Sequence, residues 1–129
     1  MSRFLWPDPK ALLDELAELM AEGGTAMQVA APERIDAGIE RARTAEGYDA
    51  DLDAAALASL IFEATSTQLV LVDGNKRFAW LSAVVFLDLN RPWFDAPEWD
   101  AFEMALGVVT KARTAEEMAV FIRAHLREA

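Results

Sequence analysis

Apolar residues recur along the chain at the three- and four-residue spacing of amphipathic helices, and turn-forming residues separate the stretches that carry this pattern. Six stretches begin with a helix-start signal, at Asp8-Pro9, Pro32-Glu33, Asp53, the Asp73-Gly74 turn, residues 95–98 and Thr114–Glu117. Stop signals agree with them, since Gly23-Gly24 closes the first stretch and residues 90–92 close the fourth. No alternating strand pattern of useful length occurs, although residues 68–72 could be briefly extended.

The fourth stretch, residues 75–90, differs from the others because it is apolar on nearly all sides. A helix of that kind is surrounded by other helices, so we expect it to be the central helix of the fold. The chain of 129 residues, 53% of them hydrophobic, is long enough for one core and too short for two. The sequence therefore predicts an all-α fold, a compact single-domain bundle of about six helices around a buried central helix, with residues 1–129 in one domain.

Composition limits the environments and partners that we expect. The longest apolar run, residues 78–87, is about half of the roughly 20 residues that cross a bilayer, and prolines and an aspartate interrupt residues 1–9, where a secretory signal would stay apolar. A net charge of −10 and an isoelectric point near 4.4 disfavour binding to nucleic acid or to an anionic membrane. The absence of cysteine excludes disulfides and thiol catalysis, and a single histidine disfavours a zinc site. We expect a cytoplasmic protein.

Against this acidic background, Asp73-Gly74-Asn75-Lys76-Arg77 places a carboxylate, an amide and two cations at the start of the fourth stretch. The structural interpretation is a turn in which Asp73 caps the helix without any ligand. The functional interpretation is an anion site at a helix N-terminus. Asp73 and Asn75 could reach a hydrated divalent cation, and the two cations suit phosphate oxygens. The motif lacks the Gly-Lys-Ser/Thr ending of a P-loop and the downstream glutamate of an EF-hand.

The remaining chemistry-bearing residues have structural interpretations. The single histidine, His125, lies near the end of the last predicted helix, where a capping or surface role is favoured over catalysis. The acidic pairs Glu15/Glu18 and Glu116/Glu117 predict solvated helix faces. Four tryptophans, which we expect to pack in the core or in a lid, occur at positions 6, 80, 93 and 99. Residues 93–94 could equally form the rim of a pocket.

The Asp73–Arg77 motif, followed by an apolar helix that ends in Phe86–Asn90, resembles the core motif of the Fic/Doc superfamily, specifically that of the short Doc-like toxins of bacterial toxin–antitoxin modules. The family pattern is His-x-Phe-x-Asp/Glu-Gly-Asn-Lys/Gly-Arg. The resemblance covers most of residues 10–127, because Gly23-Gly24, Pro32–Arg34 and the C-terminal helix fall where Doc-like proteins have them. It implies a protein kinase that uses ATP and Mg²⁺ to modify a hydroxyl of a translation elongation factor.

The resemblance also assigns a role to each motif residue. Asp73 would ligate the Mg²⁺ that bridges the nucleotide phosphates, and Gly74 would let the backbone approach those phosphates. Asn75 and the N–H groups of the helix N-terminus would hold phosphate oxygens, while Lys76 and Arg77 would add charge-assisted contacts. Lysine at position 76, where AMP-transferring Fic proteins usually have glycine, favours phosphoryl transfer. Fic-type AMP transfer to a protein hydroxyl is the alternative.

Two protein partners follow from the resemblance. An antitoxin would silence the toxin by folding a C-terminal helical segment into a surface groove, and a protein of the translation machinery would be the target. The acidic surface predicts basic residues in the antitoxin segment.

Two positions depart from the family pattern, because Leu69 stands where the family has its catalytic histidine and Leu71 where it has phenylalanine. The change at position 71 preserves apolar packing. The change at position 69 removes the base that takes the proton from the target hydroxyl, and such a base is typically worth about 10²–10⁴-fold in rate. We therefore expect an enzyme by ancestry that is inactive in this form. The intact Asp73–Arg77 motif favours a selected or deliberate inactivation over long divergence into a non-catalytic module that binds a nucleotide or a partner.

Overall fold

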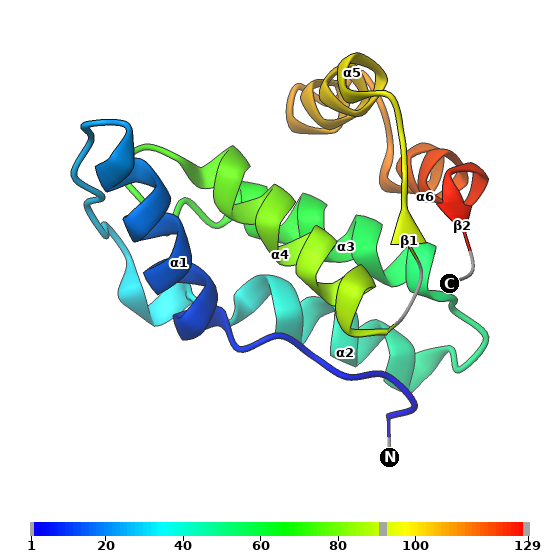
Figure 1. The fold of residues 1–129 in the computed structure, drawn as a ribbon. Coiled ribbons are helices and arrows are strands. Elements are labelled where there is room, and N and C mark those ends of the chain that lie inside the picture. The colour runs from blue at the N-terminus through cyan, green and yellow to red at the C-terminus, as the bar shows by residue number, and fades with distance from the viewer. Residues whose placement is uncertain (1, 91–92, 128–129) are drawn as a thin grey trace.

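The structure, a computed structural model, describes residues 2–90 and 93–127. Within these ranges it contains six α-helices, one 3₁₀ turn and one pair of two-residue antiparallel strands (Figure 1). The helices are α1 Pro9–Glu22, α2 Ala37–Tyr48, α3 Ala54–Thr67, α4 Asn75–Leu89, α5 Glu98–Val109 and α6 Ala115–Ala124. The 3₁₀ turn is η1 Pro32–Arg34, and the strands are β1 Trp93–Phe94 and β2 Leu126–Arg127. The predicted all-α fold is confirmed.

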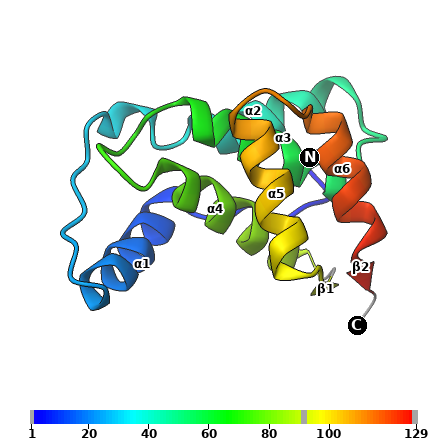
Figure 2. The same cartoon turned by 90° about the horizontal axis from the view of Figure 1, so that it is seen from above.

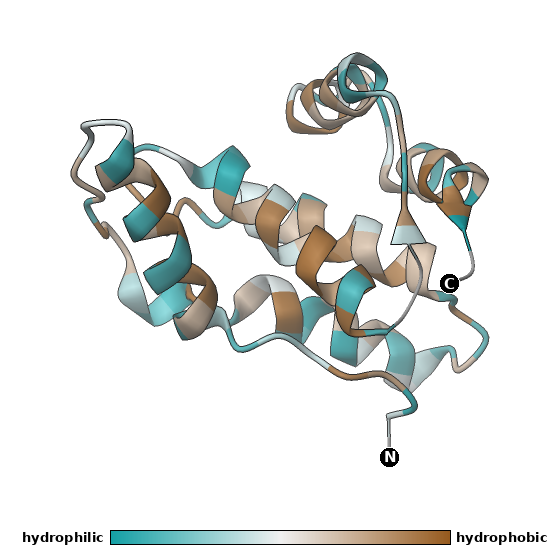
Figure 3. Ribbon diagram, viewed as in Figure 1, coloured by the Kyte–Doolittle hydropathy of each residue, from teal (hydrophilic) through white to brown (hydrophobic). Residues whose placement is uncertain are grey.

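Helices α3 and α4 pack against each other at the centre of the molecule, with α2 and α6 against α3 and α1 against α4 (Figures 1 and 2). The largest fully buried side chains include Phe62 of α3 and Phe78 and Phe86 of α4. Figure 3 shows α4 as mostly hydrophobic between hydrophilic ends, as expected for a central helix. Helix α3 shares that central position, because α2, α4 and α6 all pack against it. No helix within the described residues is long and apolar enough to cross a membrane.

The second helix begins later than its sequence signal. Pro32-Glu33 opens η1 instead of α2, and α2 continues through Gly47 to Tyr48. Proline fixes a backbone angle that suits a single 3₁₀ turn as well as a helix start, so the signal did not separate the two. Packing sets the position of α2, because a side chain at Gly38 would collide with Thr65 of α3. The two helices can approach this closely because residue 38 is glycine.

Side-chain caps confirm the first and last helix starts. The Asp8 carboxylate accepts a hydrogen bond from the Lys10 N–H (3.1 Å) at the start of α1. At the start of α6, the Thr114 side chain accepts from the Glu117 N–H, and the Glu117 side chain accepts from the Thr114 N–H (both 3.1 Å). The capping box predicted from the sequence is therefore present.

Asn90 ends α4 and also holds the N-terminal segment. Its side chain accepts a hydrogen bond from the Leu5 N–H (2.7 Å) and donates one to the Leu5 carbonyl (2.8 Å). Asn90 is the described part of the predicted stop signal, and residues 91–92 lie outside the described residues.

The other residues with structural interpretations lie largely as predicted. His125 ends α6, and its Nδ1 lies 2.8 Å from the Phe121 carbonyl, so the ring has a helix-end role. The side chains of the two acidic pairs are exposed. Among the tryptophans, Trp6 and Trp80 pack against the core, whereas Trp93 and Trp99 keep 65% and 67% of their surface exposed.

An ion pair at the start of α3 predicts a pH-dependent stability. Asp53 caps α3 by accepting the Ala56 N–H (2.9 Å), and its carboxylate accepts two hydrogen bonds from Arg123 of α6 (2.6 and 3.0 Å). The Arg123 guanidinium, more than the Ala56 N–H, holds the pKa of Asp53 below its usual 3.8. A lowered carboxyl pKa gives stability that is present above pH 3.8 and lost as the pH falls through the folded-state pKa.

We expect Asp53→Asn to keep the cap and to remove this pH dependence, because an amide oxygen still accepts the Ala56 N–H but carries no charge. Urea unfolding of the parent and the variant from pH 7 to pH 2.5 measures the difference. The parent should have the larger free energy of unfolding at pH 7, and the difference between the two proteins should shrink below about pH 4. A difference in the free energy of unfolding that stays constant across this pH range would contradict the prediction.

Candidate functional site

The connection between α3 and α4 is held in place by residues 28–31. Two N–H groups of that segment, at positions 30 and 31, donate to the Val70 carbonyl (2.8 and 2.9 Å). The Val72 N–H donates in turn to the Gln28 carbonyl (3.0 Å). The brief extension predicted for residues 68–72 is therefore present at Leu71, which pairs with Val29, but not at Leu69, where φ is 53°.

Asn75 holds the opposite side of this connection. Val29 and Leu71 face each other in an isolated antiparallel bridge whose neighbours make the hydrogen bonds, so the N–H and C=O of Leu71 point away from Val29. The Asn75 side chain meets both groups: it accepts from the Leu71 N–H (2.9 Å) and donates to the Leu71 carbonyl (2.7 Å). The Leu71 side chain is buried, with 2% of its surface exposed, in accord with its predicted packing role. Asn75 is thus a positioning residue, because both polar groups of its side chain are engaged by the Leu71 backbone.

Gly74 is the residue that starts α4. It has a φ of 96°, a left-handed conformation that glycine adopts without steric cost. The N-cap role considered for Asp73 is wrong, because the cap is Gly74 and the Asp73 carboxylate accepts a hydrogen bond from the Gly74 N–H (2.9 Å). Among the described residues, no side chain caps α4. The first N–H groups of this helix, at the positive end of its dipole, therefore have no side-chain acceptor among the described residues.

Lys76 and Arg77 bring two positive charges to the same helix end. Both side chains are exposed, and neither forms an ion pair with a carboxylate of the described residues. The Lys76 ammonium lies 5.5 Å from the centre of the Phe102 ring on α5, which is a cation–π distance. In a chain with a net charge of −10, these two cations give one helix end a local preference for anions.

Asp73 is the residue to which the resemblance gives the metal. It is exposed, and the described residues contain no group of three His, Asp or Glu side chains that could hold a metal ion. The protein thus offers Mg²⁺ one carboxylate at this end of α4. Such a donor set fits an ion that takes its other oxygen ligands from water and from nucleotide phosphates, which is how Mg²⁺ commonly binds at phosphate sites.

Leu69 has an unusual conformation for a leucine. Its φ of 53° lies in the left-handed region, and 59% of its surface is exposed. Histidine, asparagine and aspartate are several-fold enriched in this region, whereas leucine is uncommon there. The preceding carbonyl, at Gln68, accepts a hydrogen bond from the Arg34 guanidinium (3.2 Å). The backbone at position 69 therefore suits a polar side chain better than the leucine that is present.

Residues of α1, α4 and α5, with Lys76 and Arg77 among them, line a cleft of about 800 Å³. Figure 2 shows α4 lying between α1 and α5. Its lining is mostly apolar and includes Leu16, Leu19, Trp80, Leu81, Phe94 and Phe102. On opposite walls, Leu19 and Phe102 keep 52% and 47% of their surface exposed. The alternative prediction that residues 93–94 rim a pocket is confirmed for Phe94.

This cleft was not predicted from the sequence, and of the exposed apolar residues of α5 only Phe102 lines it. Four apolar residues of α5 that recur at helical spacing are exposed: Trp99, Phe102, Leu106 and Val109. A second face, with Ala101, Ala105 and Val108, is buried. An apolar face wider than the buried one indicates a helix with a further partner.

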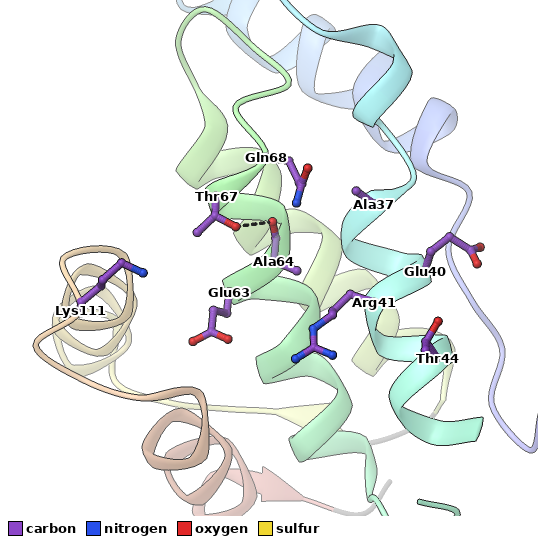
Figure 4. A pocket seen from close by; sticks show the side chains of 9 residues that line it. All are labelled: Ala37, Glu40, Arg41, Thr44, Glu63, Ala64, Thr67, Gln68 and Lys111. Atoms are coloured by element: carbon purple, nitrogen blue, oxygen red, sulfur yellow. Dashed lines mark hydrogen bonds between the residues drawn. The ribbon is translucent and has the colours of Figure 1, made fainter. Parts of the chain in front are cut away.

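A second depression, of about 560 Å³, lies over α2 and α3 (Figure 4). Arg41 reaches toward α3 from α2, and Lys111 points toward α3 from the connection between α5 and α6. Carboxylates of Glu40 and Glu63 line the same depression. Because both signs of charge are mixed, this surface has no clear preference for an anion or a cation.

Comparison of the sequence with models of known protein families gives no match, and comparison with curated proteins gives none either. The resemblance to the Fic/Doc superfamily therefore depends on the motif residues alone.

Proposed function

We propose that the chain is a Doc-like protein that holds an Mg²⁺–nucleotide at the N-terminus of α4. In this proposal it descends from toxins that transfer a phosphoryl group from ATP to a protein hydroxyl. The observation that carries the proposal is the arrangement of Gly74, Lys76 and Arg77. A left-handed glycine leaves uncapped N–H groups beside two cations that have no carboxylate partner among the described residues. Phosphates are the anions that such a helix end favours.

Each residue would contribute to nucleotide binding in a different way. The N–H groups of the first turn and the planar Arg77 guanidinium would bind phosphate oxygens, the guanidinium by two parallel hydrogen bonds. Lys76 would move from the Phe102 ring to the phosphates, since its stem is flexible. Asp73 would hold Mg²⁺, which when bound neutralises charge on the phosphates. The target hydroxyl needs a base at position 69, and leucine accepts no proton.

Lys76 is also the residue that favours phosphoryl transfer over AMP transfer, by resemblance to the Doc-like branch of the superfamily. The target would then be a protein of the translation machinery, within the cytoplasm. A non-catalytic module that binds a nucleotide is the second candidate. It is favoured by one observation, the exposed leucine at the position of the family's base.

We further propose that the cleft between α1 and α5 receives the helical segment of an antitoxin. Its mostly apolar lining and its two exposed wall residues suit the apolar face of an amphipathic helix. Glu15 and Glu22 lie one helical turn before and after Leu19 on α1. Acidic residues beside an apolar wall favour a basic partner helix, in agreement with the expectation from the net charge.

Thermal unfolding with Mg²⁺–ATP tests the nucleotide site. A ligand at about 100 times its Kd stabilises a folded protein by about 2.7 kcal/mol, so the melting temperature should rise with ATP concentration. We expect Arg77→Ala to abolish this rise. Arg41→Ala is the matched control, because Arg41 is also exposed and lies on α2, away from the site. No rise in the parent, or an equal rise in Arg77→Ala, would contradict the proposal.

A further inference from the structure

The turn that contains η1 holds the backbone on both sides of Leu69. After Leu69, the Val70 carbonyl accepts hydrogen bonds from the N–H groups at positions 30 and 31 (2.8 and 2.9 Å). Before it, the Gln68 carbonyl accepts a hydrogen bond from the Arg34 guanidinium (3.2 Å). The Arg34 N–H donates in turn to the Ala31 carbonyl (3.0 Å). One short turn of the chain therefore binds the residue before Leu69 and the residue after it.

Leu69 needs such support, because its conformation is costly for leucine. Gln68 ends α3, and the next residue but one, Val70, is buried with 1% of its surface exposed. A left-handed residue commonly redirects the chain at a helix end, and that residue is usually glycine because a Cβ atom is strained there. The Leu69 side chain is largely exposed, so its own packing compensates little of the strain. The contacts of its neighbours must hold the backbone.

The bond to Gln68 is the contact through which Arg34 can do this. The other polar contact of its side chain, with Glu33, joins two exposed side chains at 4.0 Å, and such a pair contributes little. The Gln68 carbonyl lies at the C-terminal end of α3, where a positive charge is favoured by the helix dipole and where arginine commonly binds the last carbonyls.

We infer that Arg34 is a positioning residue, which acts through the Gln68 carbonyl to hold residue 69 in the left-handed conformation. A fixed backbone at position 69 fixes the direction in which the side chain of that residue leaves the chain. For catalysis, the inference rests on the proposed function, in which a base at position 69 accepts the proton of the target hydroxyl. Arg34 would then set where that base lies relative to the start of α4.

Leu69→Asn tests the conformational part in the protein as it stands. Asparagine tolerates the left-handed region better than leucine, so the substitution should raise the urea concentration at the unfolding midpoint. In an Arg34→Ala background, the same substitution should give at most about half of this rise, because residue 69 is then free to leave the left-handed region. Urea unfolding of the parent, the two single variants and the double variant measures the coupling.

Arg43→Ala is the matched control for this comparison. Arg43 is as exposed as Arg34 and also contacts a nearby glutamate, Glu40 (3.8 Å), but it lies on α2. The full rise from Leu69→Asn should remain in the Arg43→Ala background. No rise in the parent, or an equal rise in the parent and in the Arg34→Ala background, would overturn the inference.

The catalytic part is tested in a Leu69→His background. There, Arg34→Ala should lower kcat for phosphate transfer at least about tenfold, since misplacing a reacting group by about 1 Å can cost 10²-fold. The KM for ATP should not change, and Arg34→Lys should restore much of the rate because an ammonium can donate to the same carbonyl. An unchanged kcat, or a loss that Arg34→Lys does not relieve, would overturn the positioning role. If Leu69→His is itself inactive, the proposed function fails, whereas the urea comparison still decides whether Arg34 holds residue 69.

Discussion

Leu69→His is expected to give the protein measurable transfer of phosphate from ATP to a protein hydroxyl, with a rate about 10²–10⁴-fold above that of the parent. The reason is local. Position 69 is exposed, and its left-handed backbone suits histidine better than leucine, so the substitution introduces a base four residues before Asp73 without disturbing the core. The other groups that the proposal requires, from Asp73 to Arg77, are already in place.

Bacterial lysate incubated with the variant and ATP labelled at either the γ- or the α-phosphate measures the result. Protein labelled from the γ-phosphate indicates phosphoryl transfer, and label from the α-phosphate indicates AMP transfer. Leu69→Gln is the matched control, because its amide is polar and similar in size but is not a base. If Leu69→His neither labels a protein nor slows bacterial growth when expressed, the toxin proposal is wrong and the non-catalytic module is favoured.

The sequence predicted helix positions well wherever the start signal was a local side-chain cap. Asp8, Asp53 and Thr114 each accept a hydrogen bond from an N–H two or three residues later, so their effect is contained within one turn. The predicted start of α2 at Pro32 was wrong because a contact between residues distant in sequence, not a local cap, sets the position of this helix. A close approach between Gly38 and Thr65, which are far apart in sequence, decided where α2 lies.

The candidate site was predictable in composition but not in geometry. The sequence identified the charged residues at positions 73–77. It did not predict that Gly74 caps α4, because that cap depends on a left-handed backbone that the Asp-Gly pair does not fix by itself. The cleft requires α1, α4 and α5 together, and no single stretch of sequence contains it. The conformation of Leu69 is against the preference of leucine, so only the surrounding structure could reveal it.

The resemblance assigned Asn75 to phosphate binding, whereas in the structure its side chain binds the Leu71 backbone. Its replacement is therefore expected to have a large effect on stability. Asn75→Ala removes both hydrogen bonds to the Leu71 backbone, and an unsatisfied buried polar group costs about 1–3 kcal/mol. Because Asn75 is half-buried, water can replace part of this loss, so we expect a decrease of about 2 kcal/mol in the free energy of unfolding. Asn75→Asp should be no better, since a carboxylate cannot donate to the Leu71 carbonyl. Urea unfolding measures the decrease.

Asn90 provides the control, because it makes the same two-bond contact at the other end of α4, with Leu5. Leu5 keeps 62% of its surface exposed, so water can satisfy its backbone, and Asn90→Ala should cost less than Asn75→Ala. The two variants should also differ in ligand response. Asn75→Ala should lose the rise in melting temperature with Mg²⁺–ATP, because the connection that shapes the helix end is released, whereas Asn90→Ala should keep it. Equal losses of stability with equal ATP responses would mean that Asn75 stabilises the fold without positioning the site.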